Sequence, residues 1–280
     1  MARLKPKLHP GLILPLLLVF VLSPQIAANS RENVGSCDVP LLKIATVKKV
    51  GKDGILQMTD GEKARLIGIL PVRLIENTDN PTARKLNRLA RKALEFLRRE
   101  VEGKTVKLHQ SGRKRDRYDR LLVHVTTPKG QWLQGLLLRD GLARSFSCAD
   151  NHACMNEMLE LEAGARAKRR GLWTYHIFQP QQALKSEQLL RKRYRFTLVE
   201  GRINKVANVK KWLFLNFGDN WRNDFTIAIK RKYKRKIERS GLDLLKLQGK
   251  KIRVRGWIER WNGPLIKVTH KEQIEILEGE

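Results

Sequence analysis

The chain has 280 residues and a formal net charge of +29, from 57 lysines and arginines against 28 aspartates and glutamates. This length suffices for two small domains. Most folded chains have a net charge near zero, whereas this chain is strongly basic. A folded chain tolerates such self-repulsion when it binds a polyanion or needs to stay soluble. Nucleic acid is the most common polyanion and is favoured here, with anionic lipid, cell-wall polymer and mere solubility as alternatives.

Residues 1–28 have the order of a secretory signal peptide. A positively charged start precedes an apolar, uncharged run over 11–22, and small residues follow at Ala27 and Ala28. The run has about 12 residues, too few for the roughly 20 that span a bilayer, although an uncleaved anchor is the alternative. We therefore predict an exported protein, periplasmic or secreted, with no integral membrane domain after signal cleavage.

Three short strands are predicted after a polar leader over 29–40. They cover residues 42–50, 55–58 and 64–69, and the turn Thr59-Asp60-Gly61 signals a hairpin between the last two.

A long helix is predicted next, after a loop over 76–81. Thr82 is a suitable N-cap, and apolar side chains then recur at three- and four-residue steps as far as Leu97. The order of elements over 41–176 is typical of an oligonucleotide-binding barrel with added helices. The remaining elements expected in this part are strands over 106–108 and 121–125 and helices over 132–142 and 156–170.

Residues 177–195 are polar and are predicted to form a linker. A second strand-rich unit follows over 196–280, and its order of three strands, a helix and two strands again indicates an oligonucleotide-binding barrel. The expected fold class is therefore β-rich α+β, with a five-stranded barrel and added helices followed by a second, smaller barrel-like unit. The helix of the second unit is expected over 231–247 and its strands over 196–203, 212–217, 225–229, 252–257 and 265–269.

The three cysteines offer one local cross-link in an exported chain. Cys148 and Cys154 lie six residues apart and are predicted to form a disulfide, which leaves Cys37 over. His152 lies between them and suggests a metal site, but the trio lacks a fourth ligand and the usual zinc spacings. The disulfide is therefore the favoured interpretation.

Four segments, taken together, resemble the signature segments of the staphylococcal nuclease family. They are RLIGI at 65–69, RDRYDRLLVHV at 115–125, LLLRDGLARSF at 136–146 and AKRRGLW at 167–173. The resemblance implies a nuclease-like domain over 41–176, and residues 196–280 resemble a smaller unit found behind such domains in some exported bacterial members. Members of the family cleave DNA and RNA with Ca²⁺.

The resemblance implies that this chain keeps the phosphate-binding side of the family's site. Arg65 and Arg120 match the two phosphate-binding arginines, and Asp116 and Tyr118 match the acid and the tyrosine of the second segment. Guanidinium groups complement the charge on phosphoryl oxygens. The alternative is that both arginines form only structural ion pairs.

The metal-binding side departs from the family pattern. Leu70 stands where the family has a metal-binding aspartate, and Arg73 stands where it has the glutamate that helps to activate water. The second metal aspartate falls on Gly54, with Asp53 one residue away. Ca²⁺ needs several carboxylate oxygens, so weak or absent phosphodiesterase activity is expected. Ca²⁺ would be a cofactor only if Asp53 and Glu76 rebuilt the site.

The second unit carries the densest basic cluster of the chain. Alternation along strand 251–257 places its basic side chains and a tryptophan on one face, an arrangement that suits single-stranded nucleic acid. A solvated basic surface is the alternative. The candidate nucleic-acid-binding residues are Lys230, Arg231, Lys232, Lys234, Arg235, Arg253, Arg255 and Trp257.

Further aromatic side chains alternate along the strand expected at 212–217. Trp212 and Phe214 share one face and the leucines between them share the other, so one set must be core. Trp221 and Trp261 fall in turns, where they either cap the barrel or contact a ligand.

The favoured hypothesis is an exported nucleic-acid-binding protein with a preference for single strands and reduced or lost cleavage. One alternative is an active Ca²⁺-dependent endonuclease on DNA or RNA with a rearranged carboxylate set. Another is a cell-envelope structural or adaptor protein that binds anionic polymer or membrane. The six histidines fall in no zinc-protease or triad pattern, and the sequence has no glycine-rich phosphate loop.

Overall fold

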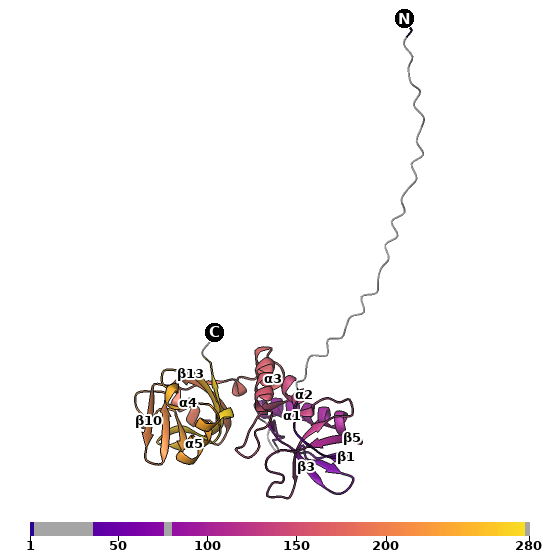
Figure 1. Cartoon of the computed structure of the whole chain (residues 1–280), viewed down its shortest axis with the longest axis horizontal. Helices are drawn as coiled ribbons and strands as arrows, with labels where there is room; N and C mark the ends of the chain where they lie inside the picture. The colour runs from indigo at the N-terminus through magenta and orange to yellow at the C-terminus, as the bar shows by residue number, and fades with distance from the viewer. Residues whose placement is uncertain (3–35, 76–79, 278–280) are drawn as a thin grey trace. The chain divides into compact units, whose positions relative to one another are not determined.

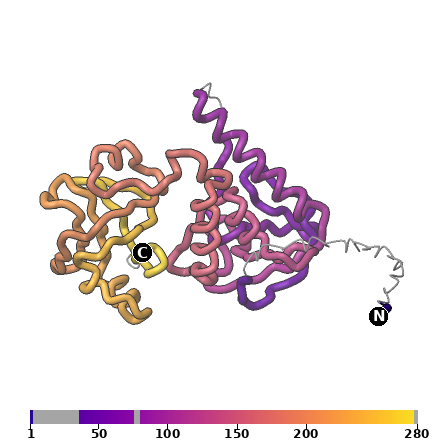
Figure 2. The backbone as a smooth tube through the Cα atoms, turned by 90° about the horizontal axis from the view of Figure 1, so that it is seen from above, coloured from indigo at the N-terminus to yellow at the C-terminus, as the bar shows by residue number. Residues whose placement is uncertain are grey.

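The computed structural model describes residues 1–2, 36–75 and 80–277. The described residues beyond 35 belong to one compact unit, which contains two clusters of buried hydrophobic side chains. We call residues 36–178 the first lobe and residues 179–277 the second lobe; Figures 1 and 2 colour them from indigo to magenta and from orange to yellow. The proposed signal peptide lies outside the described residues, apart from its first two positions. No helix in the described part is long and apolar enough to cross a membrane.

A closed barrel of five strands forms the centre of the first lobe (Figure 1). Neighbouring strands are antiparallel, except for the third and fourth in barrel order, which run parallel. This is the strand order of an oligonucleotide-binding barrel, so the predicted fold of this part is confirmed. In barrel order the strands are β1 (Leu41–Val50), β2 (Leu56–Met58), β3 (Lys63–Leu66), β6 (Leu121–Thr126) and β5 (Thr105–His109).

The long helix α1 (Pro81–Val101) packs its apolar face into the first core, with Leu89 and Leu97 buried there. The predicted cap at Thr82 is wrong. Asn80 is the N-cap, and its side-chain oxygen accepts a hydrogen bond of 2.8 Å from the amide of Thr82. The helix begins earlier because proline is favoured at the first helical position.

Shorter elements complete the first lobe around the fully buried Trp173. The 3₁₀ turn that contains Trp173 follows Arg170, whose backbone packs closely against Gly141. A Cβ on Gly141 would lie 2.2 Å from the carbonyl oxygen of Arg170. Only glycine fits there. These elements are β4 (Ile69–Pro71), α2 (Leu133–Arg139), β7 (Ala143–Ser145), α3 (Met155–Ala167), η1 (Gly171–Thr174) and η2 (His176–Phe178).

The predicted linker over 177–195 is wrong, because residues 177–178 end the first lobe and residues 179–195 are part of the folded second lobe. The segment contains β8 (Gln181–Gln182) and α4 (Ser186–Leu190). Ala183 and Leu189 are 1% and 0% exposed in the second core. The prediction failed because the segment is polar overall, although these two apolar residues attach it to the core.

The second lobe repeats the strand order of the first barrel along one sheet. The path runs β10-β11-β12-β14-β13-β9-β8, with β12 and β14 parallel and β15 beside β13. Because β9 and β10 follow each other directly in the chain, they act as two halves of one first strand. The strands are β9 (Phe196–Arg202), β10 (Lys205–Val209), β11 (Trp212–Asn216), β12 (Thr226–Lys230), β13 (Lys251–Trp261), β14 (Gly263–Val268) and β15 (Ile274–Ile276).

The basic helix α5 (Arg231–Arg239) follows β12 and is shorter than predicted. It stops at Ser240 because Gly241 takes a left-handed conformation, with φ of +95°. The 3₁₀ turns η3 (Leu245–Leu247) and η4 (Lys271–Gln273) complete the lobe.

Candidate functional site

A cavity of about 380 Å³ beside the first barrel brings four arginine side chains together. Arg65 comes from β3, Arg73 follows β4, and Arg117 and Arg120 come from the turn before β6. We call this cavity the arginine pocket. Arg65 and the Arg117–Arg120 turn meet because β3 and β6 pair in parallel, with Arg65 opposite Leu122. The two predicted phosphate-binding arginines therefore line one cavity.

Asp116 holds Arg120 in place at this pocket. Its carboxylate accepts hydrogen bonds from Nε of Arg120 at 2.8 Å and from the amide of Tyr118 at 2.9 Å. Burial tends to raise the pKa of Asp116, but the bond from Arg120 and the backbone amides hold that pKa below its usual value. Asp116 therefore stays ionised and positions the guanidinium rather than acting on a ligand.

Tyr118 lines the pocket and is 62% exposed. The guanidinium groups of Arg117 and Arg120 lie 4.7 and 4.9 Å from the ring centroid, close enough for cation–π attraction. The ring thus holds two of the four cations beside it. Because the residue is largely exposed, the ring is accessible for stacking on a flat ligand.

The pocket does not fit Ca²⁺. Asp53 is the only carboxylate among the described residues that line it, and one Asp53 oxygen already accepts a bond of 3.1 Å from the amide of Ile55. Gly54 has a φ of +77°, which disfavours an aspartate there. Ca²⁺ takes six to eight oxygen ligands, whereas this cavity presents four positive groups. Glu76 lies outside the described residues.

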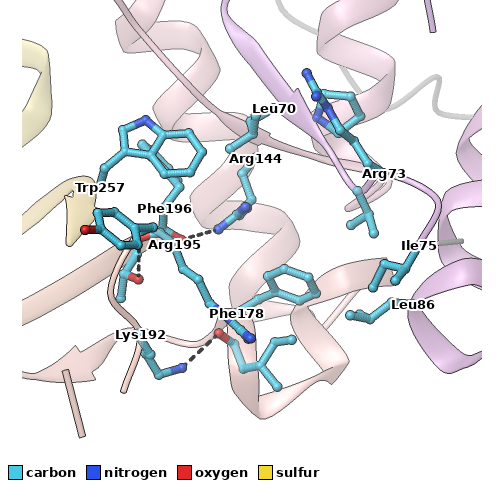
Figure 3. A pocket seen from close by; sticks show the side chains of 15 residues that line it. Leu70, Arg73, Ile75, Leu86, Arg144, Phe178, Lys192, Arg195, Phe196 and Trp257 are labelled. Carbon is cyan, nitrogen blue, oxygen red and sulfur yellow. Dashed lines mark hydrogen bonds between the residues drawn. The ribbon is translucent and has the colours of Figure 1, made fainter. Parts of the chain in front are cut away.

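Leu70 does not occupy the position expected for a metal ligand. Side chains alternate along β4 and the residues after it, so that Pro71 and Arg73 line the arginine pocket whereas Leu70 lines a second cavity. Figure 3 shows Leu70 in that second cavity. An aspartate at position 70 alone would therefore not restore a carboxylate to the arginine pocket.

The prediction that Arg253 and Arg255 bind nucleic acid is wrong. Arg255 is 1% exposed and pairs with Glu162 of α3 at 2.6 Å and with Glu275 of β15 at 2.5 Å. Arg253 pairs with Glu200 at 2.7 Å and also with Glu275. The face of β13 that carries these arginines is covered by the first lobe and by acidic side chains of neighbouring strands.

Most of the other predicted nucleic-acid-binding residues remain at the surface. Trp257 is 46% exposed, whereas Lys234 is half-buried and pairs with Glu238 at 2.7 Å. Lys230 Nζ lies 5.4 Å from the ring of Trp212. Lys230, Arg231, Lys232 and Arg235 are exposed on and beside α5.

The leucine face of β11 is the buried one. Leu213 and Leu215 are 0% exposed, whereas Trp212 and Phe214 lie on the outer face. The rings of Trp212 and Phe214 pack edge-on against Trp261, with centroids 5.3 and 5.7 Å from it. A cavity of about 460 Å³ adjoins this cluster, which gives the second lobe an aromatic surface.

The predicted disulfide is wrong in its pairing. Cys154 is bonded to Cys37 across 117 residues, whereas Cys148 is free and exposed. Cys148 and Asn151 exchange backbone hydrogen bonds of 3.2 and 2.9 Å, which form a tight turn, while Cys37 packs against the first core beside Cys154. The ligand atoms of Cys37, Cys154 and His124 lie within 4.8 Å of one another, but the disulfide uses both sulfurs.

Part of this chain is similar to known proteins. The family model described as "Staphylococcal nuclease homologue" matches residues 64–175. The thermonuclease of Staphylococcus hyicus is 23% identical over 176 residues, which cover 60% of this chain and 98% of that protein. Both Arg65 and Arg120 lie within the matched segment.

Proposed function

Because the chain carries a domain of the staphylococcal nuclease family, we propose that it is an exported protein that binds nucleic acid in the arginine pocket without Ca²⁺-dependent cleavage. The observation that carries this proposal is the composition of the pocket lining. Four arginines and a single described carboxylate, Asp53, favour a polyanion and repel a divalent cation.

The arrangement supports phosphate binding by two guanidinium forks. Arg120 is oriented by Asp116, and Arg65 lines the same cavity from the neighbouring strand. A charge-assisted hydrogen bond of this kind contributes about 1.5–3 kcal/mol. Tyr118, with its exposed ring, would stack on the base attached to the bound phosphate. Single strands are therefore the preferred ligand, because their bases are free to stack.

The same lining explains why cleavage would be weak or absent. Hydrolysis in this family requires a cation to activate water and to stabilise the developing charge. Arg73 occupies the pocket and adds positive charge where such a cation would need negative ligands. A bound phosphodiester would be held by the arginines and left intact.

Export is part of the proposal and has two supports. The first is the signal-like order of residues 1–28. The second is the disulfide between Cys37 and Cys154, since such bonds persist mainly in oxidising compartments. Fractionation of cells, with thiol labelling of each fraction, would test both points together.

Binding and cleavage assays on one preparation test the central claim. Labelled single-stranded DNA, duplex DNA and RNA would be incubated with the protein in Ca²⁺ or in chelator. We expect binding without cleavage, and a loss of affinity of about tenfold or more in Arg120→Ala. The matched control is Arg91→Ala, which removes an exposed arginine from the outer face of α1.

Two outcomes would contradict the proposal. Cleavage that needs Ca²⁺ and disappears in Arg120→Ala would identify an active endonuclease with a rearranged carboxylate set. Binding to anionic vesicles or cell-wall polymer, with no preference for nucleic acid, would identify an envelope adaptor instead.

A further inference from the structure

A second cavity, of about 540 Å³, lies between the two lobes and is shown in Figure 3. We call it the cleft pocket. Its volume lies within the range of small-molecule and nucleotide sites. The charged side chains that line it, among the described residues, are all cations: Arg73, Arg144, Lys192 and Arg195.

Arg144 is the most unusual of these cations because part of its guanidinium is buried and no carboxylate of the described residues pairs with it. Its guanidinium lies between the rings of Phe178 and Phe196, 5.0 and 5.2 Å from their centroids, and Nη1 donates to the carbonyl of Phe196 at 2.7 Å (Figure 3). Its Nε is buried and has no hydrogen-bond partner among the described residues. The nearest acidic influence is Glu162, which is already paired with Arg255.

A desolvated cation of this kind is costly unless an anion approaches it. Burial lowers the pKa of Arg144 to about 10, so that it is still charged at neutral pH. Burial also lowers the pKa of Lys192, and the charges of Arg195 and Arg144 lower it further. These cations repel one another across the cavity, and a bound phosphate would relieve that repulsion.

The cleft pocket adjoins the arginine pocket, since Pro71 and Arg73 line both cavities. Aromatic rings accompany the cations on the second-lobe side. Trp257 and Tyr194 are 46% and 71% exposed and line the cleft pocket. Alternating phosphate-binding cations and exposed rings are the features with which proteins hold single-stranded nucleic acid.

We propose that the cleft pocket is a second subsite for the same single strand, in which Arg144 and Arg195 bind a phosphate and Trp257 stacks on a base. Arg73 bridges the two subsites. This inference rests on the proposed function, because the strand must first occupy the arginine pocket.

Oligothymidylates of two lengths separate the two subsites. Fluorescence anisotropy would compare strands of about 4 and about 12 nucleotides, the range of site sizes seen for such barrels. We expect Arg144→Met and Arg195→Ala to lower the affinity for the longer strand by about tenfold. The affinity for the shorter strand, which is held in the arginine pocket, should be nearly unchanged. Arg120→Ala should weaken both strands.

Salt dependence distinguishes the phosphate contacts from the stacking contact. Each lost phosphate contact lowers the slope of log affinity against log salt by about 0.7 for single strands. Arg195→Ala should therefore lower the slope for the longer strand, whereas Trp257→Ala should weaken binding without changing it. Arg195 is exposed, so this variant tests the subsite even if Arg144→Met unfolds.

The outcomes separate the two claims. If neither strand binds, the proposed function fails. If both strands bind and the Arg144, Arg195 and Trp257 variants match Arg91→Ala at both lengths, the arginine pocket stands and the cleft subsite is overturned. Competition by inorganic phosphate at the concentration of the strand's own phosphates would assign a free-phosphate site and also overturn the inference.

Discussion

Arg255 on β13 and Glu162 on α3 form an ion pair of 2.6 Å in which the two side chains are 1% and 0% exposed. The second oxygen of Glu162 accepts a bond of 3.1 Å from the amide of Ser145, and Glu275 takes the other amino group of Arg255. The pair therefore joins the two lobes through fully desolvated charges. Removing one partner leaves the other charged, buried and unpaired.

Arg255→Met is expected to lower the free energy of unfolding by about 3–5 kcal/mol, because Glu162 is left without its cation. Denaturant unfolding at neutral pH would measure the change. Adding Glu162→Leu to Arg255→Met should recover part of the loss, since the orphaned charge is then gone. Arg260→Met is the control, because Arg260 is exposed on the same strand. If Arg260→Met destabilised the protein as much as Arg255→Met does, the role assigned to the ion pair would be contradicted.

His270 makes stability depend on pH. Its Nε2 lies 2.5 Å from the hydroxyl of Ser147, and burial, with a smaller contribution from His152, lowers its pKa to about 4. An unfolded histidine takes up its proton near pH 6.5, whereas this one does so only near 4. The stability it contributes is therefore complete above pH 6.5 and falls by roughly 3 kcal/mol as the pH drops to 4.

Denaturant unfolding at a series of pH values would test this dependence. His270→Gln should flatten the decline between pH 6.5 and 4, and the remaining decline would belong in part to His124, whose pKa burial also lowers to about 4. His176→Gln, at an exposed position, should leave the curve unchanged. A curve for His270→Gln that is parallel to that of the unmodified protein would refute the assignment.

The disulfide between Cys37 and Cys154 closes a loop of 117 residues, so its loss should be costly. We expect Cys37→Ser to lower the free energy of unfolding by about 2–5 kcal/mol. In thermal unfolding, reductant should lower the unfolding temperature of the unmodified protein to that of the variant. It should leave the unfolding temperature of the variant unchanged. Cys148→Ser should behave like the unmodified protein, and a large effect there would restore the pairing of Cys148 with Cys154.

Arg73 contributes positive charge to both cavities, and reversing that charge should harm binding more than removing it. Arg73→Ala is expected to lower the affinity for single-stranded DNA by about tenfold. It should also lower the slope of log affinity against log salt by about 0.7. Arg73→Glu should lower the affinity further through repulsion of phosphate. Anisotropy titrations at several salt concentrations measure both quantities. An effect of Arg73→Glu no larger than that of Arg91→Ala would show that position 73 does not face the ligand.

Local patterns in the sequence predicted the first barrel, because its strands and helices have distinct periodicities. The convergence of Arg65 with Arg120 was implied by segments that resemble a known family. Alternation also placed Arg253, Arg255 and Trp257 on one face of a strand. It could not show that Glu162, 93 positions earlier, pairs with Arg255 and buries it.

Long-range packing decided the other errors as well. The short separation of Cys148 and Cys154 favoured a local bridge, but the turn at Asn151 and the approach of Cys37 select the distant partner. Asp53 was a candidate ligand from its position in sequence. In the folded chain it shares its cavity with four arginines and no second described carboxylate, which no local pattern reveals.

The free thiol of Cys148 offers a practical handle. The chain has three cysteines and two are joined, so a maleimide dye would attach at a single position without any engineered residue. Cys148 lines a small cavity together with Trp257 and Arg255, at the boundary of the two lobes. A dye there would report, by its own fluorescence, when a strand enters the cleft pocket or when the lobes separate during unfolding.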